Sequence, residues 1–247
     1  MAGGADAALR PSIQIVVTGG AGPINAQNAT ANDKSLSETV TFDTHAGTGW
    51  RAAAPMPTAR RHAAAAALGG GAASLGGRVY VVGGWCAGVG LAGESRNLEV
   101  VESYDPVSDS WRAEPPMPTP RRSLQVVAQG GRLYAIGGVD EGSQLPNVES
   151  FSPEEGRWRE EPALKHKRSA FAAAAFNGQV YVAGGSSKNL KDLKDRVGDS
   201  PGAQTAGICG AAEHSTVEIL DPQAQVPAWL PGPSLPARRW ALALAAA

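Results

Sequence analysis

The stretch from Trp111 to Gly138 reads W-R-A-E-P-P-M-P-T-P-R-R-S-L-Q-V-V-A-Q-G-G-R-L-Y-A-I-G-G, and it is the unit from which the chain is built. The first glycine of its closing Gly-Gly pair lies 26 residues after the tryptophan, and the same step leads from Trp158 to Gly184. A third copy runs from Trp50 to Gly83 with a longer middle. Self-similarity at a period near 50 residues indicates a repeat architecture.

Each copy contains the same succession of short strands. An apolar run and a tight turn come first, and a second apolar run then ends at the Gly-Gly pair. A variable loop leads to a third strand, a turn containing Asp-Pro or Ser-Pro follows, and a tryptophan opens the fourth strand. Turns such as Gly130-Gly131 and Asn177-Gly178 favour hairpins because their residues accept positive φ. Four short antiparallel strands per repeat predict the blade of a β-propeller.

This succession resembles the kelch repeat, in which an apolar strand is followed by G-G, by E-x-Y-D-P, and then by Trp and a methionine-proline turn. The four Gly-Gly pairs stand at 19–20, 83–84, 137–138 and 184–185. The third-strand glutamates are Glu102, Glu149 and Glu218. The first unit departs from the pattern, because Val40 replaces the glutamate and Val16 replaces the second-strand tyrosine. The resemblance covers about residues 13–247 and implies an all-β, kelch-type β-propeller.

The number of repeats predicts four four-stranded blades. Residues 13–20 match residues 131–138 position for position, so the chain begins at the second strand of a repeat. The last segment, Ala241–Ala246, falls in phase with a first strand. We therefore expect the first blade to be shared between N-terminal and C-terminal strands, which removes two open sheet edges. The alternative is an open piece of a larger propeller, for example one with six blades.

The domain organisation follows from the same pattern. Residues 1–12 are rich in glycine and alanine and are predicted to form a disordered head without an apolar core of signal-peptide length. Residues 13–247 are predicted to form one propeller with long loops at 21–37 and 186–214. Long loops on a rigid repeat scaffold often carry function. The alternative is that they are tolerated excursions with no role.

Composition argues against several classes of partner. The formal net charge is −1, so no global field attracts nucleic acid or a membrane surface. The chain lacks a run of about 18 apolar residues, the length that a spanning helix needs. The two cysteines, Cys86 and Cys209, form no metal-binding spacing, and reduced thiols are typical of a cytoplasmic protein. We expect a cytoplasmic protein that binds neither nucleic acid nor membrane.

The sequence contains no recognisable catalytic motif. G-x-S-x-G, H-E-x-x-H and the phosphate-binding Gly-Lys-Ser/Thr are missing. The four histidines, His45, His62, His166 and His214, are scattered over different units without metal-ligand spacing. Some kelch-fold enzymes use copper with Tyr, His and Cys, and others use iron with a Glu-x-x-x-Asp-x-x-x-His run, but neither arrangement stands in this sequence. We therefore expect no catalytic residues, no metal and no cofactor.

One feature of the sequence does suggest binding. The loop that enters each first strand is basic, with Arg60-Arg61-His62, Arg121-Arg122, Lys165–Arg168 and Arg238-Arg239. Rotation about one axis places equivalent loops on one face, and the loops after the Gly-Gly pairs end at that same face. Guanidinium groups there favour carboxylates, which they bind in bidentate geometry. In kelch proteins that act as substrate receptors of ubiquitin ligases, this face takes up acidic peptide segments, and the resemblance implies the same here.

The basic residues have an alternative, structural interpretation. The first arginine of each loop recurs with the third-strand glutamate, and the two side chains can pair within or between blades. The four tryptophans that open fourth strands, Trp50, Trp111, Trp158 and Trp229, are expected to be core residues, whereas Trp85 and Trp240 lie outside that register. The predicted protein-binding residues are Arg61, His62, Trp85, Arg122, Lys167, Arg239 and Trp240.

The functional prediction is a non-enzymatic protein–protein interaction module whose basic face binds an acidic protein segment. Substrate recognition in a ubiquitin ligase is the specific role that the resemblance implies. Two alternatives remain open, namely a kelch-fold enzyme of the sugar epimerase or oxidase type and an actin-binding scaffold. The actin-binding alternative rests on fold analogy alone.

Overall fold

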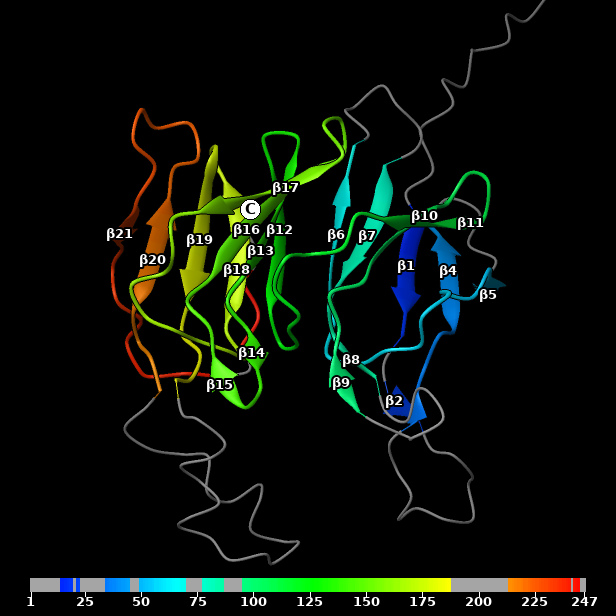
Figure 1. Cartoon of the computed structure of the whole chain (residues 1–247), viewed down its shortest axis with the longest axis horizontal. Coiled ribbons are helices and arrows are strands. Elements are labelled where there is room, and N and C mark those ends of the chain that lie inside the picture. Colours follow the sequence, from blue (N-terminus) through cyan, green and yellow to red (C-terminus); the bar gives the residue numbers. More distant parts are fainter. Residues whose placement is uncertain are drawn as a thin grey trace, which may run out of the picture.

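The computed structural model describes residues 14–19, 21–22, 34–44, 49–69, 77–86, 95–187, 213–240 and 242–244. Within these ranges the protein consists of strands and connecting turns (Figure 1). None of these residues belongs to a helix long and apolar enough to cross a membrane. The predicted all-β class is confirmed, and the predicted disordered head at residues 1–12 lies outside the described residues.

Four antiparallel sheets follow one another along the chain. Sheet 1 consists of β1 (Gln14–Thr18), β4 (Thr39–Asp43) and β5 (Trp50–Ala53). Sheet 2 consists of β6 (Ala64–Leu68), β7 (Arg78–Val82), β10 (Val101–Asp105) and β11 (Ser110–Glu114). Sheet 3 consists of β12 (Gln125–Gln129), β13 (Arg132–Ile136), β16 (Val148–Ser152) and β17 (Arg157–Glu161). Sheet 4 consists of β18 (Ala172–Phe176), β19 (Gln179–Ala183), β20 (Val217–Leu220) and β21 (Trp229–Pro231).

Short two-stranded ribbons stand at one end of the first three sheets, along the lower edge in Figure 1. They are β2 (Ala21–Gly22) with β3 (Lys34–Ser35), β8 (Trp85–Cys86) with β9 (Arg96–Asn97), and β14 (Val139–Asp140) with β15 (Ser143–Gln144). Of the predicted long loops, only the bases are described, since residues 23–33 and 188–212 lie outside the described ranges. Each ribbon follows a Gly-Gly pair and extends the second strand of its sheet toward this end.

The Gly-Gly pairs mark the points where one repeat packs against the next. Gly83 and Gly137 have φ of +63° and +55°, in the left-handed region that favours glycine. A Cβ at Gly83 would lie 2.6 Å from the backbone oxygen of Arg121, and one at Gly137 would lie 2.7 Å from that of Arg168. Glycine is required at these positions because the next repeat's backbone occupies the space of a side chain.

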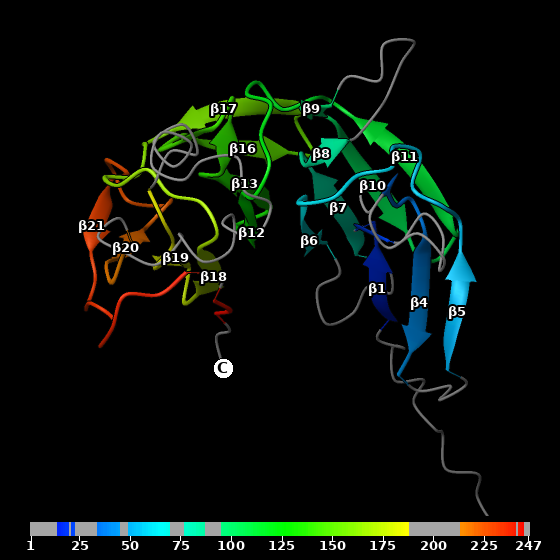
Figure 2. The same ribbon diagram turned by 90° about the horizontal axis from the view of Figure 1, so that it is seen from below.

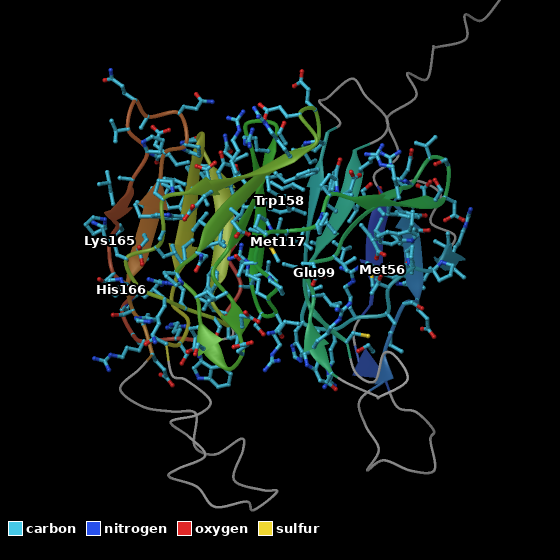
Figure 3. All side chains as sticks on the ribbon, in the orientation of Figure 1. Met56, Glu99, Met117, Trp158, Lys165 and His166 are labelled. Atoms are coloured by element: carbon cyan, nitrogen blue, oxygen red, sulfur yellow. The ribbon has the colours of Figure 1, made fainter. Side chains whose placement is uncertain are left out.

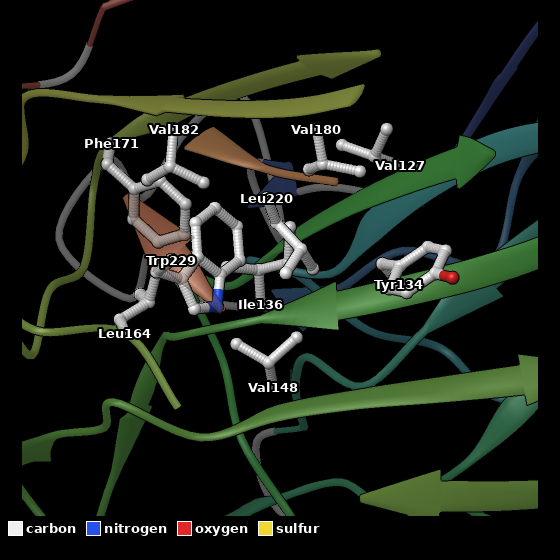
Figure 4. Packing of buried hydrophobic residues seen from close by; sticks show 10 residues of the cluster. All are labelled: Val127, Tyr134, Ile136, Val148, Leu164, Phe171, Val180, Val182, Leu220 and Trp229. Carbon is white, nitrogen blue, oxygen red and sulfur yellow. The ribbon is translucent and has the colours of Figure 1, made fainter. Parts of the chain in front are cut away.

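The hydrophobic core lies between neighbouring sheets. In Figure 2 the four sheets stand like spokes, with β6, β12 and β18 on the inside of an arc and β5, β11, β17 and β21 on the outside. Figure 4 shows the cluster between sheets 3 and 4, which consists of Val127, Tyr134, Ile136, Val148, Leu164, Phe171, Val180, Val182, Leu220 and Trp229. A second cluster joins sheets 2 and 3 and includes Tyr80, Met117 and Phe151. Stacking therefore buries the faces that a single sheet would expose.

The structure corrects the predicted shared first blade. Sheet 1 has three strands in the described residues, and Leu242–Leu244 form no strand. Leu242 contacts Gly184 as Leu124 contacts Gly83, so the tail does enter the place of a next first strand. The four sheets, however, turn through too little of a circle to bring β1 beside that place, and the arc stays open (Figures 1 and 2). The open arrangement that the sequence left as an alternative describes this chain, and the number of blades in a closed ring stays a prediction.

The tryptophans of the fourth strands join each sheet to the one before it. The indole N–H of Trp111 donates to the backbone oxygen of Ala54 at 2.8 Å. Trp158 donates to Pro115 at 2.9 Å, and Trp229 donates to Pro162 at 2.7 Å. Trp229 is a core residue as predicted, while Trp111 and Trp158 are half-buried.

The prediction that Trp50 is a core residue is wrong. Its side chain is 55% exposed, although its ring still contacts Phe42 in the neighbouring strand, with centroids 5.6 Å apart. The other three indoles are covered by the sheet that precedes their own. Trp50 belongs to the first sheet of the arc, and the described part of the chain contains no preceding sheet that could cover its ring.

Candidate functional site

Three buried arginine–glutamate pairs fix the loops that enter sheets 2, 3 and 4. Arg121 is fully buried, and its Nη2 lies 2.6 Å from Oε2 of Glu149 in the third strand of the same sheet. Its Nη1 also donates to the backbone oxygens of Gly137 and Asn147, at 3.3 and 2.9 Å. Thr119 completes the cluster by donating its hydroxyl to Glu149 at 2.6 Å. The same pair recurs as Arg60 with Glu102 and as Arg168 with Glu218.

These pairs confirm the structural interpretation for three of the four first arginines. Burial lowers the pKa of Arg60, Arg121 and Arg168, and the neighbouring glutamate charge opposes that change. Each guanidinium is enclosed by its own sheet and is not available to a ligand. Arg239, the fourth, is exposed and has no glutamate of this kind among the described residues, because the sheet that would supply it is not present.

The residue after each buried arginine pairs with the residue after the Gly-Gly pair of the same repeat. Arg61 and Trp85 exchange backbone hydrogen bonds of 3.0 and 2.8 Å, and Arg122 and Val139 exchange bonds of 3.1 and 2.8 Å. Ser169 and Ser186 form the third such bridge, at 3.0 Å in both directions. These bridges confirm that the basic loops and the loops after Gly-Gly lie on one face.

The third bridge also corrects the predicted position of Lys167. The residue equivalent to Arg61 and Arg122 in sheet 4 is Ser169, and Lys167 lies two residues earlier, where its side chain is exposed. Figure 3 shows its neighbours Lys165 and His166 at the side of sheet 4, away from Glu99, which lies near the middle of the view. Lys167 is therefore not part of the same cluster as the two arginines.

Arg61, Trp85 and Arg122 come together between sheets 2 and 3. The guanidinium carbon of Arg61 lies over the Trp85 ring, 4.1 Å from its centroid, in a cation–π contact. Arg122 Nη1 donates to Oδ1 of Asn97 at 3.1 Å. Burial lowers the pKa of the Arg122 guanidinium, and the positive charge of nearby Arg61 lowers it further. The prediction that Trp85 is a contact residue of the loop face is compatible with this placement.

Beside this cluster lies a pocket of about 470 Å³. Its wall includes Trp85 and Arg122 together with Arg96, Asn97, Glu99, Asp140 and Glu141. Asn97 connects basic and acidic residues, because it accepts from Arg122 and donates its Nδ2 to Oδ1 of Asp140 at 2.8 Å. The pocket wall thus contains both basic and acidic side chains, and the negative charge of Asp140 opposes the lowering of the Arg122 pKa.

The acidic wall of this pocket was not foreseen from the sequence. Glu99 lies in the loop between β9 and β10, and Asp140 and Glu141 follow the third Gly-Gly pair. These positions belong to the variable loop of each repeat, where the pattern predicts no residue type. The sequence signal for them was their place in the loops after Gly-Gly, which the bridges put beside the basic loops.

The remaining predicted binding residues are accessible but dispersed. His62 is exposed, with φ of +55°. Trp240 is 37% exposed and Arg239 is exposed, and both stand at the end of the chain that follows sheet 4. The predicted continuous basic ring is therefore reduced to a compact Arg61–Trp85–Arg122 cluster, with Lys167, Arg239 and Trp240 placed around sheet 4.

Two histidines that lie far apart in the sequence are adjacent in space. The rings of His166 and His214 have centroids 5.5 Å apart, and Nδ1 of His166 lies 3.1 Å from Oε1 of Glu218. Burial lowers the pKa of His214, and the positive charges of Arg168 and His166 lower it further. In the described ranges, no three His, Cys, Asp or Glu side chains gather in a way that suits a metal ion.

Acidification should destabilise sheet 4 through His214. Because its folded pKa is lower than the ordinary value of about 6.5, the unfolded chain binds the proton more readily, and stability is lost as pH falls through that range. We expect the melting temperature to drop between about pH 7.5 and about pH 5.5, and His214→Gln to make this drop smaller. Thermal denaturation followed by circular dichroism measures it. His62→Gln is the control and should melt with the parent's pH dependence. An equal drop in His214→Gln would exclude the mechanism.

Comparisons with known proteins agree with the repeat pattern. The model of the Kelch motif matches residues 66–118 and 120–165. The kelch repeat and BTB domain-containing protein 12 of Danio rerio is 30% identical over 132 residues, which cover 51% of this chain and 20% of that protein. The chain thus matches only a fifth of the length of that relative.

A solved structure supports the fold. The structure of YjhT matches 90% of this chain and 66% of its own chain, with a TM-score of 0.64 and 17% sequence identity. At this identity the likeness shows the fold alone. The Kelch motif model matches two successive repeats and the solved structure shares the fold, and both agree with the repeating four-stranded sheets, so this chain contains kelch repeats and its sheets are blades of a β-propeller.

Proposed function

We propose that the protein is a non-enzymatic interaction module whose loop face binds an acidic segment of a partner protein. The observation that carries the proposal is the Arg61–Trp85–Arg122 cluster beside the pocket. The cluster places two guanidinium groups beside the pocket, outside the three buried arginine–glutamate pairs that fix the loops. Kelch repeats commonly mediate protein–protein contacts, which supports the general role.

The geometry of the cluster suits a carboxylate. Arg61 is held over Trp85 by the cation–π contact, so its guanidinium loses less freedom when it binds a ligand than that of an unrestrained arginine would. Arg122 donates Nη1 to Asn97 and keeps other donors for a ligand. A carboxylate between the two guanidinium groups would relieve the repulsion that lowers the pKa of Arg122.

The acidic wall of the pocket sets the direction of the bound segment. Glu99, Asp140 and Glu141 would repel a second carboxylate placed deep in the pocket and would favour a basic or polar side chain there. We therefore propose that the segment offers an acidic residue to the arginines and a different side chain to the pocket.

The specific biological role that we propose is substrate recognition in a ubiquitin ligase in the cytoplasm. Its support is the likeness to a curated relative whose name includes a BTB domain, together with the cluster's suitability for an acidic segment. The absence of recognisable catalytic motifs in the sequence supports a non-enzymatic role. No observation favours the epimerase, oxidase or actin-binding alternatives.

Removing both guanidinium groups should abolish most of the binding. We expect Arg61→Ala with Arg122→Ala to weaken the binding of acidic twelve-residue peptides by about tenfold or more, since charge-assisted hydrogen bonds contribute roughly 1.5–3 kcal/mol each. Fluorescence polarisation with an array of such peptides measures it. The matched peptides, with Gln for Glu and Asn for Asp, should bind weakly to both proteins. Binding to the parent should also weaken as salt rises.

Two further variants separate the cluster from general charge. Arg157→Ala removes a 63% exposed guanidinium on β17 and should leave peptide binding unchanged. Lys167→Ala should have a small effect, because Lys167 lies away from the cluster. If the double variant retains its melting temperature and still binds acidic peptides as the parent does, this face is not the binding site.

A further inference from the structure

The β8–β9 ribbon carries an asparagine that contacts both a basic and an acidic side chain of the next repeat. Asn97 Oδ1 accepts a hydrogen bond from Arg122 Nη1 at 3.1 Å, and Asn97 Nδ2 donates to Oδ1 of Asp140 at 2.8 Å. These partners fix the orientation of the amide, because a guanidinium only donates hydrogen bonds and an ionised carboxylate only accepts them. A neutral group thus lies between two opposite charges.

Arg122 and Asp140 attract each other but share no direct hydrogen bond in the described part of the chain. The charge of Asp140 opposes the lowering of the Arg122 pKa, so the two groups are close enough to interact. The preceding arginine is different, because Arg121 donates directly to Glu149 at 2.6 Å and is enclosed by its own sheet. Arg122 instead lines the pocket.

The asparagine is itself held in place by the ribbon. Asn97 stands opposite Trp85 in the register of β8 and β9, and its Nδ2 also lies 3.4 Å from the backbone oxygen of Val139. The next residue, Leu98, is 2% exposed and donates its N–H to a backbone oxygen at 2.9 Å. Because Arg61 lies over the Trp85 ring, one ribbon contacts both guanidinium groups of the cluster.

We propose that Asn97 is a positioning residue of the Arg61–Trp85–Arg122 cluster, whose amide keeps Arg122 from forming an ion pair with Asp140. The guanidinium then stays available to the carboxylate of a partner. This inference rests on the proposed function for the ligand and adds the residue that keeps the site receptive to it. Without the amide, Arg122 and Asp140 would come together, and the partner's carboxylate would have to compete with Asp140 for the same donors.

Asn97 also has a simpler interpretation, as a link between neighbouring repeats. At the equivalent place in the preceding ribbon, the Ser35 hydroxyl donates to the backbone oxygen of Trp85 at 3.4 Å, as Asn97 does to Val139. A link alone predicts that loss of the Asn97 side chain loosens the site and that further loss of the Asp140 side chain does not repair it. The positioning role predicts repair, because Asp140 is then the competitor.

The binding of acidic twelve-residue peptides, measured by fluorescence polarisation, separates these two roles. Asn97→Ala should weaken binding about fivefold, the size expected when one partly exposed ion pair competes with the ligand. Asp140→Ala should bind at least as tightly as the parent. Asn97→Ala with Asp140→Ala should bind within about twofold of Asp140→Ala, because no competing carboxylate remains.

A change of the amide to a carboxylate tests whether its neutrality matters. Asn97→Asp should weaken peptide binding at least as much as Asn97→Ala, because the new carboxylate itself pairs with Arg122. Asp140→Ala should not restore binding in that variant. Asn147→Ala is the matched control, since Asn147 is a half-buried asparagine in the connection between β15 and β16, and it should bind as the parent does.

A crystal structure of Asn97→Ala tests the positioning role without a peptide. It should show a nitrogen of Arg122 within about 4 Å of a carboxylate oxygen of Asp140. Circular dichroism melting shows that each variant is folded at the temperature of the binding assay.

The two measurements distinguish failure of this role from failure of the proposed function. If the parent binds no acidic peptide, the proposed function is wrong, and the crystal structure still decides what Asn97 does. If Arg122 stays apart from Asp140 in Asn97→Ala, the positioning role is wrong even when the parent binds the peptides. A loss of binding in folded Asn97→Ala that Asp140→Ala fails to restore would also overturn it.

Discussion

Replacing Glu149 with alanine should lower the free energy of unfolding by about 3–5 kcal/mol, because the change leaves the Arg121 guanidinium buried without its counter-charge. Arg121 has no exposed surface, and its other partners are neutral, namely the Met117 sulfur and the backbone oxygens of Gly137 and Asn147. Thr119 would also lose the acceptor of its hydroxyl hydrogen bond. Urea denaturation of the parent and the variant measures the difference.

An exposed ion pair provides the matched control. Arg157 Nε lies 2.9 Å from Oε2 of Glu155 at the start of β17, and the two side chains are 63% and 34% exposed. Arg157→Ala should therefore change stability by less than about 1 kcal/mol. Replacing both members of the buried pair, as Arg121→Met with Glu149→Leu, should recover much of the loss, because neither charge is then left unpaired. A loss under about 1 kcal/mol in Glu149→Ala would show that Arg121 reaches water in solution.

The repeat made most of the fold predictable. Gly83, Gly137 and Gly184 each occupy a point where the next repeat's backbone excludes a Cβ, so the physical requirement recurs and the sequence shows it. The pairing of Arg121 with Glu149 also recurs in other repeats. The sequence predicted this pairing as the alternative to ligand binding by the arginine. Where one contact is made several times, its residues recur at fixed spacing.

The candidate site was predictable only in part, because its acidic half does not recur. Arg61 and Arg122 stand at one repeat position and were found, but Asp140 and Glu99 lie in loops of unequal length and content. Lys167 was assigned to the cluster because it is basic, whereas the backbone bridge of Ser169 with Ser186 shows which residue occupies the equivalent place. The positive charge of Lys167 did not show which position of the repeat this residue occupies.

The sequence did not predict that the four sheets form an open arc, and the physical reason is a different one. Counted along the repeat pattern, the last residues of the chain match a first strand, and the contact of Leu242 with Gly184 agrees with this match. The position of a residue within the repeat does not set the rotation between neighbouring sheets. That rotation depends on the size of the side chains packed between the sheets. The exposed ring of Trp50 agrees with this, since none of the sheets formed by the described residues covers it.

The second large effect is expected at Trp229. Trp229→Ala should lower the free energy of unfolding by about 3–5 kcal/mol, the usual range for removal of a buried aromatic side chain. Its side chain is 2% exposed within the cluster between sheets 3 and 4, beside Leu164 and Phe171 (Figure 4). The same change removes the indole hydrogen bond to Pro162. Chemical denaturation followed by tyrosine and tryptophan fluorescence and by circular dichroism measures the loss.

Trp229→Phe separates packing from the hydrogen bond. It keeps an aromatic ring in the cluster and removes the donor, so it should cost about 1–3 kcal/mol, less than the alanine variant, because the Pro162 oxygen loses its partner and a small void is left. If the two variants lose the same stability, the hydrogen bond rather than the buried ring joins sheets 3 and 4. If Trp229→Ala costs less than about 1 kcal/mol, the cluster closes around the missing ring and the joint is held by the remaining side chains. The expected order, with alanine worse than phenylalanine, follows from a joint in which the ring fills space between two sheets and its N–H fixes their relative position.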